Sequence, residues 1–182
     1  MRFPIVLASA SPRRKELLAR LVPEFEIVVS DVDEEALTVA DPFLTAERLA
    51  EAKACAVALL RPDALVIGAD TVVSLNGLQF AKPRDAEDAR RMLRALSGGT
   101  HDVITGVSLV SPEGTTTFHD RTEVTFRPLT SEEIDAYVAT GEPMDKAGAY
   151  AIQGGARGFV AERKGSESNV IGLPLEALGE LL

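Results

Sequence analysis

The chain has 182 residues, of which 46% are hydrophobic and 26% are charged. This composition is typical of globular proteins, and the length suits a single domain over residues 1–182. The sequence contains no apolar run long enough to cross a membrane, and a single cysteine excludes an internal disulfide framework. Nucleic-acid polymers are bound mainly by Lys and Arg, so a net charge of −9 makes such a partner unexpected. We therefore expect a soluble, cytoplasmic protein.

Helices and strands alternate along the chain. In order, we expect strand 3–8, helix 12–21, strand 25–29, an acidic loop at 31–35, a helix from 41 or 45 to 60, strand 64–73, hairpin strand 78–81, helix 85–96, strands 101–110 and 115–126, helix 130–141, strand 159–162 and helix 175–182. At least two hairpins predict a mixed α/β sheet with flanking helices. The hairpin half, from about residue 100, and the N-terminal half are expected to form two lobes around a cleft.

The segment Ser9–Arg14 brings two hydroxyls and two arginines to the start of a helix. Ser11 is a good N-cap, and proline is favoured at the first helical position that follows it. Helix N-termini present free N–H groups, and arginine forks match phosphate oxygens. The segment lacks the Gly-Lys-Ser/Thr of a Walker loop. Two interpretations stay open, a phosphate site or a well-capped helix with surface arginines.

Asp70 interrupts an apolar, β-branched run. Burying a bare carboxylate is costly, so Asp70 is paired, metal-bound or catalytic, unless it caps a turn at the strand end. The acidic segment 31–35 supplies further oxygen ligands of the kind that Mg²⁺ prefers, or it is solvated surface.

Two lysines are candidates for phosphate contacts. Lys53 falls on the same helical stripe as Leu49 and Leu60, which is unusual for a lysine. Lys82 follows the predicted hairpin strand. The alternatives are that Lys53 extends out to solvent and that Lys82 is an exposed hairpin lysine.

A long irregular stretch runs over residues 141–155. Loops of this length are usually functional or disordered, and the small residues around Tyr150 and Ile152 favour order. Gln153 carries both a donor and an acceptor, which suits the edge of a nucleobase.

The remaining reactive side chains point to no familiar chemistry. Cys55 lies on an alanine-rich helix and is expected to pack in the core. His101 and His119 fall on hairpin strands with no nucleophile beside them, so neither a catalytic triad nor a histidine-rich metal site is expected.

Five segments, in order over nearly the whole chain, resemble the Maf family of nucleotide pyrophosphatases. They are LASASPRRKELL at 7–18, GADTVV at 68–73, KPRDA at 82–86, TGEPMDKAGAYAIQG at 140–154 and NVIGLPL at 169–175. The resemblance implies an elongated mixed α/β fold shared with inosine triphosphate pyrophosphatases. It also implies hydrolysis of nucleoside triphosphates between the α- and β-phosphates, with Mg²⁺ or Mn²⁺ as cofactor, in the house-cleaning of nucleotide pools.

The same resemblance assigns roles to individual residues. Asp70 matches the general base, and Glu34 together with Asp70 matches the metal site, with Glu35 as the adjacent alternative. The polar and cationic substrate positions are matched by Ser9, Arg13, Arg14, Lys53 and Lys82.

Segment 140–154 resembles the branch of the family that acts on dTTP and UTP. Arg13, Thr71 and Gln153 match positions tied to substrate choice there, whereas branches acting on 7-methyl-GTP have Glu near the Gln153 position. Thymine and uracil present acceptor–donor–acceptor edges that an amide complements, while the adjacent donors of guanine pair better with a carboxylate. Lys146 lies in this segment, with no expected role beyond ordering the loop.

We therefore expect a dTTP and UTP pyrophosphatase. The alternatives are the same reaction on a modified nucleotide such as 7-methyl-GTP or ITP, and a non-catalytic role in cell-division regulation. The expected partner is a small nucleoside triphosphate, without a membrane or a nucleic-acid polymer. Family members are often dimeric, so a homodimer is the assembly to test for.

Overall fold

The computed structural model describes residues 2–182, and its centre is a seven-stranded mixed sheet. The strand order is β2-β1-β3-β5-β6-β7, and β4 also pairs with β3. The strands are β1 (Ile5–Leu7), β2 (Glu26–Ile27), β3 (Leu65–Leu75), β4 (Leu78–Phe80), β5 (Thr100–Ser111), β6 (Gly114–Phe126) and β7 (Val160–Lys164). Pairing is parallel where β1 meets β2 and β3, and antiparallel elsewhere. The mixed sheet predicted from the hairpins is confirmed.

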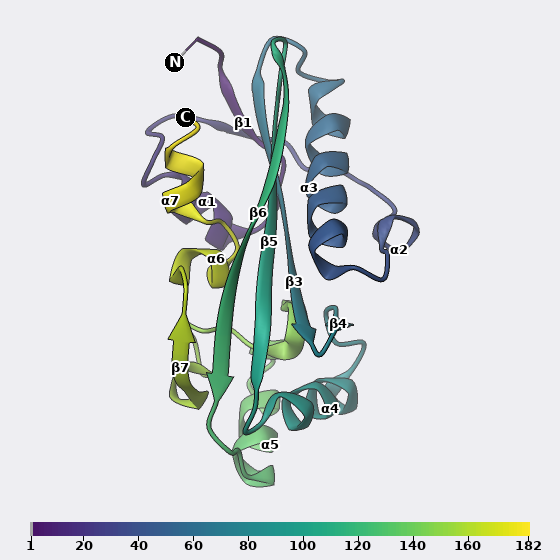
Figure 1. The fold of residues 1–182 in the computed structure, drawn as a ribbon, viewed down its shortest axis with the longest axis vertical. Helices are drawn as coiled ribbons and strands as arrows, with labels where there is room; N and C mark the ends of the chain where they lie inside the picture. The colour runs from purple at the N-terminus through teal and green to yellow at the C-terminus, as the bar shows by residue number, and fades with distance from the viewer. Residues whose placement is uncertain (1) are drawn as a thin grey trace.

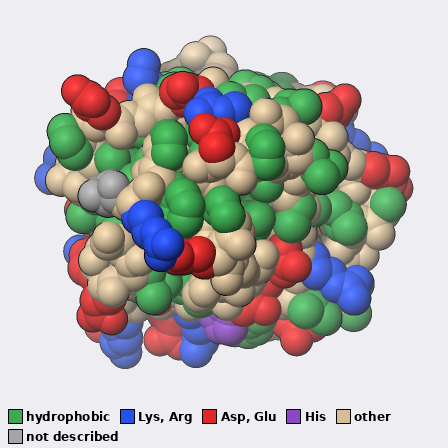
Figure 2. Space-filling view, turned by 90° about the horizontal axis from the view of Figure 1, so that it is seen from above, with side chains coloured by type: hydrophobic (Ala, Val, Ile, Leu, Met, Phe, Trp, Pro, Cys, Tyr) green, Lys and Arg blue, Asp and Glu red, His purple; other side chains and the backbone are tan. Residues whose placement is uncertain are grey.

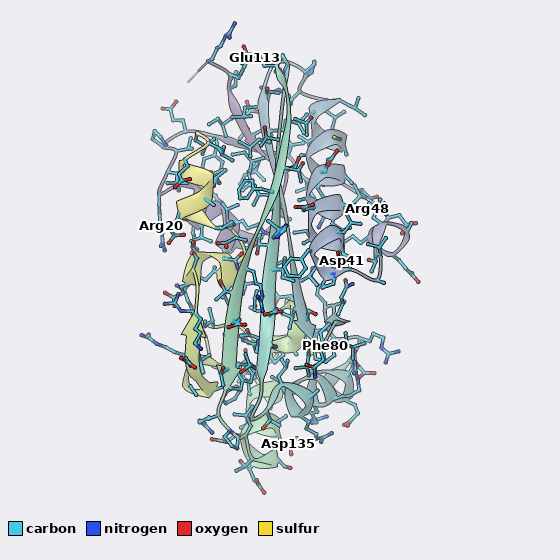
Figure 3. All side chains as sticks on the ribbon, viewed as in Figure 1. Arg20, Asp41, Arg48, Phe80, Glu113 and Asp135 are labelled. Atoms are coloured by element: carbon cyan, nitrogen blue, oxygen red, sulfur yellow. The ribbon has the colours of Figure 1, made fainter. Side chains whose placement is uncertain are left out.

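Helices cover both faces of the sheet, and three long strands give the molecule an elongated shape (Figure 1). The helices are α1 (Pro12–Leu18), α2 (Glu34–Leu37), α3 (Pro42–Ala58), α4 (Ala86–Leu96), α5 (Ser131–Ala139), α6 (Glu167–Ile171) and α7 (Leu175–Gly179). Helix α3 lies on one face, and α1, α6 and α7 lie on the other (Figure 1). Arg48 on the outer side of α3 is exposed (Figure 3). Within residues 2–182, no helix is both long and apolar enough to cross a bilayer.

Local sequence signals shape the elements as predicted. The Ser11 hydroxyl accepts from the N–H of Arg14 and caps α1. Asn76 and Gly77 adopt φ values of 51° and 81° in the turn between β3 and β4, as a two-residue hairpin requires. Thr130 forms the predicted capping box at the start of α5.

Helix α3 rests directly on the backbone of the sheet. A Cβ at Gly68 of β3 would lie 2.3 Å from the carbonyl oxygen of Ala50, and one at Gly106 of β5 would lie 2.2 Å from that of Ala46. Real Cβ atoms do not approach so closely, so both glycines are needed for this packing. Alternate residues of β3 point to opposite faces, so Asp70 shares the α3 face with Gly68.

The boundary between the two predicted lobes does not lie near residue 100. Strand β5 pairs with β3 along a register that runs from Val66–Val110 to Ser74–Asp102. The hairpin strands therefore extend through the whole molecule. The hydrophobic cores divide instead across the long strands, with one around Leu7 and α1 and another around α4, α5 and residues 149–159.

Several element boundaries also differ from the predictions. Helix α1 ends at Leu18 rather than Leu21, and Leu60 lies beyond the end of α3 and is 68% exposed. The expected acidic loop contains the short helix α2, because the Asp33 side chain accepts from the N–H of Ala36 and caps it. Helix α6 was not predicted, since five residues are too few for a clear periodic pattern.

Replacing Gly106 with Ala should destabilise the protein by about 1–3 kcal/mol, because the new methyl group must push α3 away from the sheet. Urea unfolding followed by circular dichroism measures the loss. Gly158→Ala is the matched control, since a Cβ there meets nothing within 4 Å. Equal stability of the two variants would contradict the packing argument.

Candidate active site

A gap in one edge of the sheet creates the main cavity. Strand β1 follows β3 only as far as Leu7–Ile67, and β4 joins the same edge only at Phe80–Val73. Between Ile67 and Val73 the edge of β3 has no neighbouring strand within the described part of the chain. A cavity of about 610 Å³ opens there, and a second of about 420 Å³ adjoins it. These volumes suit a small ligand of nucleotide size.

The predicted site residues gather around these two cavities. Those that line at least one of them are Ser9, Arg13, Arg14, Glu34, Glu35, Lys53, Asp70, Thr71, Lys82 and Gln153. They come from segments as distant as the turn before α1 and the loop after η2 (Ala147–Ala149). The structure therefore brings together every residue that the sequence pointed to, while their individual roles stay predictions.

The turn between β1 and α1 forms the floor of the smaller cavity. The Ser9 hydroxyl accepts from the N–H of Ser11 at 3.2 Å, and Ser9 is only 9% exposed. The turn presents the start of α1 to the cavity, so the local field favours a negatively charged group.

The two adjacent arginines differ in what they touch. Arg14 donates from Nε to the Gly172 carbonyl at 2.7 Å and from Nη2 to the Thr71 hydroxyl at 2.9 Å. Burial lowers the pKa of the Arg14 guanidinium below its usual value, against the attraction of Asp70. Arg13 and Lys82 line both cavities, and within residues 2–182 neither forms an ion pair. Their donors are free for a ligand, whereas those of Arg14 mainly hold the protein together.

Lys53 joins two carboxylates at the centre of the site. Its Nζ lies 2.6 Å from Oδ1 of Asp70 and 2.8 Å from Oε1 of Glu34. The side chains of Lys53 and Asp70 are 14% and 13% exposed, whereas that of Glu34 is 60% exposed. The close packing of α3 on Gly68 explains why a lysine from α3 reaches a carboxylate on β3.

The pKa values of the two carboxyl groups are shifted in opposite directions. Burial raises the pKa of the Asp70 carboxyl above 3.8, although the charges of Lys53 and Arg14 act the other way. The hydrogen bond from Lys53 holds the pKa of the Glu34 carboxyl below 4.5. Burial therefore makes Asp70 a stronger base than an ordinary Asp, whereas the contact with Lys53 makes Glu34 a weaker base than an ordinary Glu.

The donor set fits a divalent metal that arrives with phosphate. Within residues 2–182 no group of three or more His, Cys, Asp or Glu side chains could hold an ion by itself. Glu34 and Asp70 nevertheless converge on one point, marked by the ammonium of Lys53. Mg²⁺ is commonly held by one or two carboxylates together with substrate phosphates, so this pair is a suitable protein contribution. Glu34 contacts Lys53, which favours it over Glu35.

The larger cavity has an apolar end. Val73, Phe80, Tyr150 and Ile152 line it, and Phe80 comes from β4 (Figure 3). Gln153 lies at the same cavity and is exposed. Apolar walls with one amide are suited to a planar heterocyclic ring.

The loop that carries Gln153 is fixed by contacts that the sequence analysis missed. The Ala151 N–H donates to the Tyr137 hydroxyl at 3.0 Å, and the Gly155 N–H donates to Oε2 of Glu142 at 3.0 Å. A Cβ at Gly154 would lie 2.0 Å from the Glu142 carboxylate. The pair of glycines after Gln153 was the one local signal for this packing.

Lys146 contacts its own loop and also lines the cavities. It donates to Asp145 at 2.6 Å and its side chain is 13% exposed, and it lines both cavities. Cys55 is only half-buried, so the expected core packing is incomplete. His101 is buried and hydrogen-bonds Tyr150, and His119 contacts Glu47, so neither faces a nucleophile.

Comparisons with known proteins identify the family of the chain. The family model described as Maf-like protein matches residues 4–182. A Moorella thermoacetica protein named dTTP/UTP pyrophosphatase is 54% identical over 182 residues, which cover 98% of this chain and 93% of that relative. A Bacillus cytotoxicus protein of the same name is 50% identical over 173 residues, covering 95% of this chain and 91% of that relative.

Solved structures that the chain resembles share only its fold. The Ham1 protein of Staphylococcus aureus matches with a TM-score of 0.55 and 17% identity, covering 98% of this chain and 97% of that one. A HAM1 protein from Coxiella burnetii matches with a TM-score of 0.50 and 16% identity, over 98% of each chain. The predicted mixed α/β fold with flanking helices is confirmed.

Substituting Lys53 with Met should raise the pKa of Asp70 further. The lysine charge and hydrogen bond lower that pKa while burial raises it, so removing Lys53 leaves burial less opposed. The titration of the Asp70 carboxyl carbon, followed by NMR, should move to higher pH. Lys146→Met is the control, because it removes a cavity lysine that does not contact Asp70. A midpoint that stays in place or falls in Lys53→Met would contradict the assignment.

Proposed function

Because the chain belongs to the Maf family, we propose that it hydrolyses dTTP and UTP to the nucleoside monophosphate and pyrophosphate. The observation that carries the proposal is the buried Lys53–Asp70 pair beside Glu34, at a cavity with free cations. The names of the relatives, at about half identity over nearly the full chain, support the same substrates.

Asp70 accepts the proton of the water that attacks the α-phosphorus. The new bond joins the water oxygen to that phosphorus, the bond from phosphorus to the bridging oxygen breaks, and pyrophosphate leaves. A carboxylate with a raised pKa is a better base near neutral pH than an ordinary Asp. Glu34 and Asp70 would hold Mg²⁺ or Mn²⁺, and the bound ion would supply positive charge against the triphosphate.

Cationic side chains bind the phosphates. Arg13 and Lys82 line both cavities and contribute guanidinium and ammonium donors, and the turn at Ser9 adds backbone N–H groups. These groups stabilise the charge that develops on the leaving pyrophosphate. Arg14 contributes charge to the same region, while its hydrogen bonds hold Thr71 and Gly172.

The base is selected at the larger cavity by Arg13, Thr71 and Gln153. The amide of Gln153 complements the acceptor–donor–acceptor edge of thymine and uracil. A guanine presents adjacent donors there and leaves one unpaired, which costs about 1–3 kcal/mol for each unmet buried hydrogen bond. A modified purine such as 7-methyl-GTP is the competing substrate class.

A nucleic-acid polymer is the less suitable partner. On the end of the molecule seen in Figure 2, basic side chains of the described residues lie scattered among acidic ones. Polymer binding needs several Lys and Arg aligned along a backbone. We propose that the protein acts on free nucleotides in the cytoplasm, and light scattering would measure whether it does so as a homodimer.

A pyrophosphate-release panel tests the proposed substrates. We expect turnover of dTTP and UTP with Mg²⁺ or Mn²⁺, slower turnover of 7-methyl-GTP and ITP, and loss of activity on adding EDTA. A preference for a modified purine would overturn the substrate assignment. Failure to hydrolyse any triphosphate, together with a salt-sensitive DNA shift, would favour the regulatory alternative.

Replacing Asp70 with Asn should lower kcat by at least about 100-fold, the contribution expected of a positioned general base. The amide cannot accept the proton, but it preserves size and leaves nucleotide affinity largely intact. Steady-state kinetics and equilibrium titration of dTTP separate the two effects, and circular dichroism checks the fold. Full activity of this variant would exclude Asp70 as the base.

A further inference from the structure

A line of buried hydroxyl and amide groups runs inward from Thr71. Thr105 on β5 is the register partner of Thr71 on β3, and the two hydroxyl oxygens lie 2.9 Å apart. The Thr105 hydroxyl also lies 2.9 Å from the backbone carbonyl oxygen of Asn169 in α6. Thr105 and Asn169 are both 0% exposed. The side-chain amide of Asn169 donates to the Val103 carbonyl at 3.0 Å, which holds Asn169 in the core.

Counting protons fixes the direction of each hydrogen bond. A threonine hydroxyl has one proton to donate and two lone pairs, and a carbonyl oxygen can only accept. Thr105 therefore donates its proton to the Asn169 carbonyl. Since that proton is used, the contact between the two hydroxyls requires Thr71 to donate to Thr105.

The other neighbour of Thr71 uses one of its lone pairs. Arg14 Nη2 lies 2.9 Å from the Thr71 oxygen, and a guanidinium can only donate. Thr71 has thus committed its proton and one lone pair inside the protein. One lone pair remains, and Thr71 is half-buried and lines the larger cavity.

We propose that Arg14, Thr105 and Asn169 lock Thr71 as a hydrogen-bond acceptor, so that the cavity selects a nucleoside with a donor facing Thr71. Thr105 is then a positioning residue for substrate choice, although it lies behind the cavity wall. This inference rests on the proposed function and specifies the chemistry that Thr71 recognises.

Two donors on the proposed substrates match this acceptor. Thymine and uracil both carry the imide N3–H, whereas cytosine has a bare lone pair at N3. dTTP and UTP also share the 3′-hydroxyl of the sugar. In either case, a ligand atom with only lone pairs would face a lone pair of Thr71, and Thr71 cannot turn its proton outward without breaking its bond to Thr105.

Thr105→Val tests whether Thr71 is fixed as an acceptor. Valine is close in size to threonine, and its lack of a hydroxyl leaves the Thr71 proton free for a ligand. We would measure kcat/KM for UTP against CTP, and for dTTP against its 3′-O-methyl analogue, whose 3′ oxygen can only accept. If the imide N–H is the donor, the UTP:CTP ratio should fall by about 10- to 100-fold, the range for one buried hydrogen bond. If the 3′-hydroxyl is the donor, the ratio of dTTP to its analogue should fall instead.

Thr105→Ser is the matched control, since it keeps the hydroxyl and should keep both wild-type ratios. Thr71→Val provides a second measurement that does not depend on the stability of Thr105→Val. It removes the acceptor, so it should lower the same ratio, whereas a merely structural Thr71 would lower the rates for both substrates equally.

Unchanged ratios in both Val variants would overturn the inference. A wild-type protein that hydrolyses neither dTTP nor UTP would overturn the proposed function itself, and with it the inference. An active wild-type enzyme with insensitive ratios would leave the proposed function standing and overturn the inference alone.

Discussion

The direct contact of α3 with the sheet backbone is the constraint on which the site depends. Gly68 and Gly106 leave room for carbonyl groups of α3 at distances that no side chain would allow. That approach brings the ammonium of Lys53 to within 2.6 Å of Asp70. With a thicker layer of side chains between helix and sheet, Asp70 would be a buried carboxylate without a partner, which is costly. The glycines thus determine the electrostatics of the site as well as its packing.

The interruption of the sheet edge gives the cavity access to both faces of β3. Successive residues on a strand point to opposite faces, so Asp70 and Thr71 face different layers of the molecule. Asp70 faces α3 and the carboxylate of Glu34, and Thr71 faces α1 and α6. A continuous sheet would separate these two environments completely. Where β1 has ended and β4 has not begun, one ligand can reach both, so the proposed base and the proposed specificity residue lie one residue apart.

Sequence patterns predicted what depends on neighbouring residues, and they failed where contacts are distant. The Ser11 cap and the Asn76–Gly77 turn each carry a local signal that the structure bears out, and the motif residues around Asp70 line one cavity. Thr105 lies 34 residues from Thr71 and 64 from Asn169 along the chain. In the sequence, Thr105 and Asn169 are ordinary small polar residues without a signal of their own. The lobe boundary failed for the same reason, because strand pairing along the whole length of β3 is a tertiary property.

Arg14 interacts with both Asp70 and Thr71. Its charge lowers the pKa of Asp70, and two of its donors bind Thr71 and the carbonyl of Gly172. Burial of the guanidinium has a cost, seen in its lowered pKa, and the nearby carboxylate offsets part of it. The carboxylate therefore stabilises the buried guanidinium that hydrogen-bonds Thr71. Asp70 and Thr71, which face opposite sides of β3, are thus connected through a single buried cation.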